Sequence, residues 1–110
     1  MLDRQRVEQR ILSLHTILSQ LSRMQIEELD LSHCKLKDKG AHAVGEFLSR
    51  HQNLKILHLT NNNIGPIGVA GIVHGLLKAS STALKHLDFR LNPLQTEGAN
   101  HICARKFNIL

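Results

Sequence analysis

One apolar pattern occurs three times along this chain of 110 residues. Each copy has the form L-x-x-L-x-L-x-x-N/C-x-L, in which Ile or Phe replaces Leu at some of the apolar positions. The copies begin at Ile26, Leu54 and Leu84, so they are 54 − 26 = 28 and 84 − 54 = 30 residues apart. A constant period of roughly 20 to 50 residues is typical of repeat architectures, whose units are stable only when stacked on their neighbours.

The segments between the three copies correspond as well. Gly40, Gly68 and Gly98 occupy equivalent positions. Apolar residues follow each glycine at the spacing of one helix face; they are Val44, Leu48, Ile72, Leu76 and Ile102. We therefore predict a strand, a turn and a helix in each unit, with the strands in one parallel sheet and the helices on one face of it.

The unit lengths, the glycine after the turn and the Asn or Cys position resemble the ribonuclease-inhibitor-like leucine-rich repeats. The resemblance covers about residues 24 to 103. It implies an α/β solenoid with short parallel strands on its concave face and helices on its convex face. Residues 25–103 are then three repeats, of which the third is incomplete.

The two ends of the chain depart from the repeat. Residues 5 to 22 place apolar residues on one helical face, namely Val7, Ile11, Leu14, Leu18 and Leu21. We expect residues 1–24 to form a helical cap on the first repeat, or to be the remaining helix of a preceding one. Residues 104–110 are an atypical tail that stops before a fourth strand could begin. We expect an uncapped edge on the last strand, open to self-association, in a piece of a longer repeat protein.

The polar position of the pattern holds Cys34, Asn62 and Asn92. An asparagine there can bond main-chain groups of the turn that would otherwise be buried without partners. We predict that the three residues form one inward-facing polar column, in which the Cys34 thiol is buried rather than reactive. Asn61 and Asn63 are expected to face water.

Residues that alternate with the strand leucines point to the concave face, where we predict partner binding. They are Glu28, Asp30, Ser32, Ile56, His58, Thr60, His86, Asp88 and Arg90. Neighbouring strands lie about 5 Å apart, so His58 is expected between the carboxylates of Asp30 and Asp88. The result is a mixed-charge surface suited to polar contacts with a protein.

A metal site is an alternative interpretation of Asp30, His58, His86 and Asp88. The ligand types are suitable, but solvated side chains on parallel strands do not converge on one point, so we predict no metal site. Lys35, Lys37 and Lys39 form either a solvated rim or a contact with an acidic partner. No cofactor motif and no nucleophile with a base is present, so we expect no cofactor and no enzyme.

Composition narrows the class of protein. The net charge of +5 makes nucleic acid a third candidate partner, but no aromatic residues are interleaved to stack bases. Two cysteines are too few for a disulfide scaffold, which favours a reduced, cytoplasmic setting. The apolar stretches are short and the N-terminus is charged, so we expect neither a membrane span nor a secretory signal.

Residues 28–49, which begin E-L-D-L-S-H, and residues 86–98, which contain R-L-N, resemble the leucine-rich-repeat subunit of the nexin–dynein regulatory complex. That resemblance implies a scaffold of the axoneme, part of the cytoskeleton of motile cilia and flagella, with other subunits of the complex as partners. Residues 61–68, N-N-N-I-G-P-I-G, resemble the repeats of NOD-like receptors. The alternative is therefore a cytosolic fragment of receptor or inhibitor type that binds a protein.

Overall fold

The computed structural model describes residues 14–51, 53–79, 83–103 and 108–109. A helix over residues 14–21 comes first, and strands then alternate with helices. These elements are β1 (Glu28–Asp30), α2 (Lys37–Arg50), β2 (Ile56–His58), α3 (Pro66–Lys78), β3 (His86–Asp88), α4 (Gln95–Cys103) and β4 (Asn108–Ile109).

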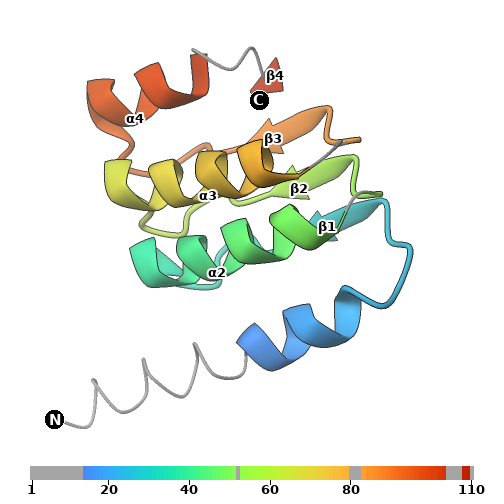
Figure 1. The fold of residues 1–110 in the computed structure, drawn as a ribbon. Coiled ribbons are helices and arrows are strands. Elements are labelled where there is room, and N and C mark those ends of the chain that lie inside the picture. The colour runs from blue at the N-terminus through green and yellow to red at the C-terminus, as the bar shows by residue number, and fades with distance from the viewer. Residues whose placement is uncertain (1–13, 52, 80–82, 104–107, 110) are drawn as a thin grey trace, which may run out of the picture.

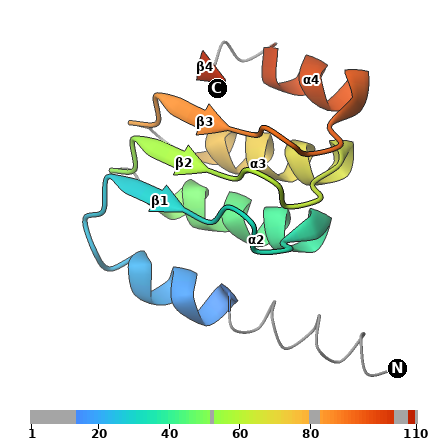
Figure 2. The ribbon, with the colours of Figure 1, turned by 180° about the vertical axis from the view of Figure 1, so that it is seen from behind.

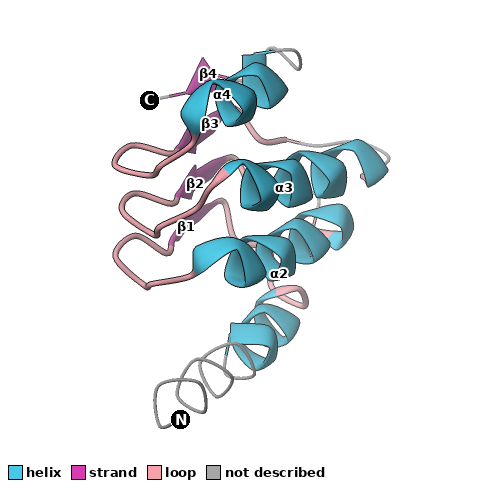
Figure 3. Cartoon of the chain, turned by 90° about the vertical axis from the view of Figure 1, so that its left-hand side faces the viewer, coloured by secondary structure: helices cyan, strands magenta, loops and turns pink. Residues whose placement is uncertain are grey.

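The strands form one parallel sheet in the order β1-β2-β3-β4. Helices α2, α3 and α4 lie in a second layer on one face of this sheet (Figure 1). Seen from behind, the strands have no helix in front of them (Figure 2). The turns that follow β1, β2 and β3 stack on one another at one side of the molecule (Figure 3). This is the α/β repeat arrangement that the spacing predicts.

The core lies between the two layers and consists mainly of aliphatic side chains. Leu57 and Leu59 of the second unit and Leu87 of the third are buried, as are Val44 of α2 and Ile72 of α3. Strand residues alternate between the two faces of a sheet, so the pattern leucines face the helices. Burial of this face, rather than three-residue strand propensity, stabilises the sheet.

Two glycines allow α2 and α3 to lie very close together. A Cβ atom on Gly45 would lie 2.3 Å from the carbonyl oxygen of Gly71, and one on Gly75 would lie 1.9 Å from the carbonyl oxygen of Gly45. Both distances are far below van der Waals contact. The close packing of these helices therefore requires residues without a Cβ atom at positions 45 and 75.

The N-terminal helix packs against the first repeat. Leu14 and Leu18 are buried in the core, and Leu21 is partly buried against it. The buried ring of His51 lies 5.0 Å from that of Phe47, and its Nε2 atom is 2.8 Å from the carbonyl oxygen of Met24. Since a carbonyl only accepts, Nε2 carries the hydrogen. The expected apolar residues at positions 7 and 11 lie outside the described residues.

The expectation of an uncapped last strand is wrong. Strand β4 pairs with β3, with Asn108 opposite His86 and Ile109 opposite Leu87. The pairing was missed because this unit is shorter than the others: 109 − 87 = 22 residues separate the paired positions, and α4 has 9 residues where α2 has 14. Within the described residues, every helix is too short or too polar to cross a membrane.

Candidate interaction face and the turns that support it

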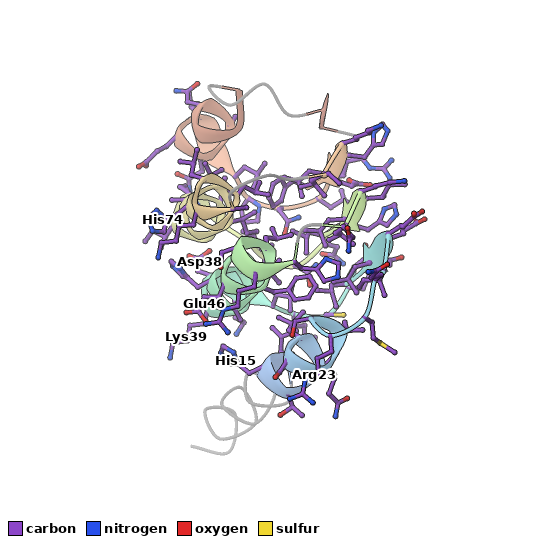
Figure 4. The ribbon with its side chains drawn as sticks, turned by 45° about the vertical axis from the view of Figure 1, so that its right-hand side comes forward. His15, Arg23, Asp38, Lys39, Glu46 and His74 are labelled. Atoms are coloured by element: carbon purple, nitrogen blue, oxygen red, sulfur yellow. The ribbon has the colours of Figure 1, made fainter. Side chains whose placement is uncertain are left out.

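The nine residues predicted to bind a partner lie on or just after β1, β2 and β3. We call the surface that they form the strand face. Its columns follow the strand register, in which Ile56 pairs with Glu28 and His86, and His58 pairs with Asp30 and Asp88. Side chains project from the strands on the side away from the helices (Figure 4).

The expected surroundings of His58 are only partly right. Its backbone lies between Asp30 and Asp88, but its Nε2 atom is 2.7 Å from Oε2 of Glu28. The other two carboxylates have local partners. Asp30 accepts a 2.9 Å hydrogen bond from the Ser32 backbone N–H, and Asp88 binds Arg90. Sequence spacing places residues in columns but does not choose among three neighbouring carboxylates.

Asp88 and Arg90 form the best-defined ion pair of the strand face. Nε of Arg90 lies 3.0 Å from Oδ1 of Asp88, and Nη2 lies 2.8 Å from Oδ2. Only 3% of the Asp88 side chain is exposed, against 67% for Arg90. The hydrogen bonds from Arg90 lower the pKa of Asp88, and in return Asp88 raises the pKa of Arg90. This bidentate geometry holds the guanidinium group of Arg90 beside Asp88, two residues back along the chain.

A row of charged residues beside the strand face was not predicted. Glu27, Lys55 and Lys85 are aligned, because the Lys55 N–H donates to the Glu27 carbonyl at 2.7 Å and the Lys85 N–H donates to the Lys55 carbonyl at 2.8 Å. Lys55 also lies 3.3 Å from Glu27 through its side chain. Each residue occupies the second position of the pattern, so the repeat contained the signal needed to find this row.

The asparagines of the polar column connect each turn to the preceding one. Oδ1 of Asn62 accepts from the backbone N–H groups of Cys34 and Leu36, and Nδ2 donates to the carbonyl of Leu31. One repeat later, Oδ1 of Asn92 accepts from the backbone N–H groups of Asn62 and Ile64. These bonds pair turn groups that the sheet leaves without partners.

The expected burial of Cys34 is wrong, because its side chain is exposed. A polar side chain in this column serves the turn of the unit before it, and Cys34 is the first member of the column. Its Sγ instead donates to the carbonyl of Ser32 at 3.3 Å. Partial desolvation raises the pKa of the thiol, and the Asp30 carboxylate acts in the same direction.

The flanking asparagines have a structural role that sequence analysis missed. Asn61 and Asn63 are exposed, as predicted, but they adopt φ angles of 55° and 53°. Asparagine tolerates this left-handed region better than most residues. At the position equivalent to Asn61, the other turns place His33 and Leu91, at 58° and 60°. Leucine does not favour this left-handed conformation, so the backbone at Leu91 costs more conformational free energy than at Asn61 or His33.

Another contact between units involves Asp38, at the start of α2. Its Oδ1 atom accepts a 2.8 Å hydrogen bond from the backbone N–H of Gly65, just before α3. Gly65 is a residue of the segment 65–71, which is rich in glycine. Asp38 therefore joins the start of one helix to the start of the next, a role that its place in the sequence did not suggest.

The metal site and the lysine cluster were the alternative sites considered from the sequence. No group of three or more His, Cys, Asp or Glu residues converges as a metal site within the described part of the chain. Lys35, Lys37 and Lys39 are all exposed, and the first two have positive φ angles. They lie in and after the turn that follows β1, outside the strand face. Contact of these lysines with an acidic partner stays a prediction.

Comparison with known families identifies a repeat family. The family model described as Leucine Rich repeat matches residues 25–45, 50–73 and 80–103, which is more than half of the chain. Each match contains one of the strands β1, β2 and β3 and at least part of the helix that follows it. Comparison with curated proteins finds no match to this chain.

Proposed function

Since the chain belongs to the leucine-rich-repeat family, we propose that it is a non-enzymatic module that binds another protein through the strand face. In this proposal the stack is a solenoid with the strand face on its concave side. The observation that carries it is the layer arrangement, in which helices cover one face of the sheet and leave mixed polar and charged side chains on the other (Figures 2 and 4).

The strand face has the composition of a protein contact. Ile56 is half-buried on its central strand, between Glu28 and His86, and hydroxyl, carboxylate, imidazole and guanidinium groups make up the rest of the face. Several of these groups are held in place, as Arg90 is by Asp88. Preorganised polar groups reduce the entropy lost on binding, which favours recognition by a small surface.

Site-specific photo-crosslinking tests which face binds. A photoreactive residue at position 56 would sit in the strand face, and one at position 74 would sit on the helix side, where Figure 4 shows His74. We expect a crosslinked product of this chain with a different protein from position 56 and little from position 74. Crosslinking from position 74 alone would assign binding to the helices and reject the proposed face.

At finer resolution, we propose that the partner belongs to the nexin–dynein regulatory complex of motile cilia. This rests on the likeness of residues 28–49 and 86–98 to the leucine-rich-repeat subunit of that complex. Detergent extraction of ciliated or sperm cells tests the location. Retention in the salt-washed axoneme, with crosslinks to subunits of the complex, would support it. Release with the soluble cytosol would reject it and favour the receptor- or inhibitor-type alternative suggested by residues 61–68.

A further inference from the structure

The strand face has opposite charges at its two sides. Glu27, Glu28 and Asp30 lie on or beside β1. Lys85 and Arg90 lie beside β3, with His86 on the strand itself. Asp88 is also on β3, where it is buried and paired with the exposed Arg90 side chain, so this pair adds little net charge and Lys85 supplies most of the basic charge of this side. Charge therefore changes from acidic to basic across the sheet order β1-β2-β3.

We propose that the strand face also binds a second copy of this chain in a face-to-face dimer. The two-fold axis of this dimer lies between the two faces and is parallel to β2. Such an axis places β1 of one copy over β3 of the other. An axis in the plane of the face but perpendicular to the strands would instead place β1 over β1 and oppose carboxylates to carboxylates. The charges therefore select one arrangement.

The strand register determines which residues face each other across this axis. Glu28 and His86 share one column, so Glu28 of one copy faces His86 of the other. Glu27 and Lys85 share a row and face each other in the same way, whereas Lys55, the middle member of the row, faces its own copy and is ion-paired with Glu27 of its own chain. These two oppositions occur twice, once on each side of the axis, as a two-fold interface requires.

Arg90 completes the complementarity. Asp30 is aligned with Asp88, so two carboxylates would meet across the interface if Asp88 were exposed. Asp88 is instead buried and paired with the exposed guanidinium group of Arg90, whose Nη2 atom lies 2.8 Å from its Oδ2 atom. Asp30 of one copy thus faces the Arg90 guanidinium of the other. Ile56, on the central strand, meets its own copy near the axis and supplies an apolar contact between the charged residues of the two sides.

The size of the face limits the strength of the dimer. Three strands about 5 Å apart, each contributing five positions at about 3.3 Å per residue, present roughly 250 Å². Two such faces bury less than the roughly 1,200 Å² of a stable interface. We therefore expect a dissociation constant of about 0.1 to 1 mM at low salt. Exposed charges contribute much of the binding, so salt should weaken it strongly.

The test is the oligomeric state of the purified chain, measured by NMR translational diffusion from about 0.05 to 1 mM at low and at high salt. We expect a concentration-dependent shift toward dimer that high salt abolishes. Two variants address the mechanism. Lys85→Glu makes the β3 side more acidic, and Glu27→Lys makes the β1 side more basic, so each places like charges at positions 27 and 85 and should weaken its own dimer by about tenfold or more.

The two variants complement each other. An equimolar mixture of Lys85→Glu and Glu27→Lys chains should regain association, because residue 85 of each chain then faces a residue 27 of opposite charge on the other. Lys39→Glu is the matched control, since it makes the same change of charge on the helix side (Figure 4) and should leave dimerisation unchanged. Circular dichroism of each variant verifies that the fold is retained.

A chain that stays monomeric at about 1 mM and low salt would overturn the proposed dimer. So would a dimer that persists in Lys85→Glu or that Lys39→Glu weakens equally. Either result leaves the proposed function intact, because crosslinking from position 56 distinguishes a product of two identical chains from a product with a different protein.

Discussion

Asn62 shows how much one side chain contributes to a repeat. It is buried, and its amide bonds main-chain groups of the preceding turn on both its oxygen and its nitrogen. Those turn groups have no ladder partner, so removal of the amide leaves buried polar groups unpaired. The cost of an unpaired buried group exceeds the net contribution of a typical hydrogen bond.

We expect Asn62→Ala to lower the free energy of unfolding by about 3 kcal/mol, since the buried Leu36 N–H and the part-buried Cys34 N–H both lose their partner. Urea denaturation followed by circular dichroism measures this. Cys34→Ala is the matched control in the same column. Its side chain is exposed and makes one bond, so the change should be about 0.5 kcal/mol or less. Equal losses in the two variants would contradict the conclusion that the asparagines, rather than Cys34, stabilise the turns.

Asp88 makes stability depend on pH on the acid side. Its hydrogen bonds with Arg90 lower its pKa in the folded chain, so the ionised form is favoured by folding. This contribution is present above the unfolded pKa of about 3.9 and is lost as the pH falls through the lower folded pKa. Asp30, whose pKa is lowered by the Ser32 backbone N–H, acts in the same sense.

We therefore expect Asp88→Asn to be less stable than the parent chain at pH 7 and to lose less stability on acidification. Urea denaturation at pH 7 and at about pH 3 measures both effects, because the two values lie on either side of the unfolded pKa. A variant whose stability falls as steeply as that of the parent would show that Asp88 is not the group responsible.

The distance between α2 and α3 depends on the glycines at the contact between these two helices. The two helices have no room for a Cβ atom at Gly45, which faces the backbone of the neighbouring helix. Gly71 differs, because a Cβ atom there would meet the exposed ring of His42 at 2.5 Å rather than a backbone atom. A surface ring can rotate away, whereas a packed helix backbone cannot.

Gly45→Ala should therefore lower the free energy of unfolding by about 3 kcal/mol through overpacking. Gly71→Ala should be nearly neutral, because the displacement of His42 is offset by the better helix propensity of alanine, about 1 kcal/mol. Thermal or urea unfolding of both variants gives the comparison. Similar losses would mean that the helices adjust, and that the glycines at the contact are replaceable.

At the scale of the whole molecule, stability should be graded along the stack. The second unit has an ordered unit on each side, and its Leu57, Leu59 and Ile72 are fully buried. In repeat proteins each unit depends chiefly on its immediate neighbours, so outer units open more readily.

Native-state hydrogen exchange tests this gradient. We expect amides of β2 and α3 to exchange at least about tenfold more slowly than those of residues 14–21 and of α4, because the outer helices can detach without breaking the central contact. The order should persist at low concentrations of denaturant. Identical protection in all three units would instead indicate one cooperative transition for the whole chain.

The repeat period by itself determined the order of strands and helices and the register of the sheet. Periodicity reports which residues point toward the helices and which residues share a column, so the parallel strands, their register and the members of the strand face follow from it. The family match agrees with the same units. Composition added that aliphatic side chains fill the core.

Tertiary structure decided which groups meet. His58 binds Glu28 rather than Asp30 or Asp88, Asn62 bonds the turn before its own, Cys34 is exposed, and β4 covers the edge of β3. These outcomes depend on competition among side chains a few Å apart, and on where one short helix returns the chain to the sheet. A sequence pattern encodes spacing along the chain, whereas hydrogen bonds form between whichever donors and acceptors the fold brings within about 3 Å.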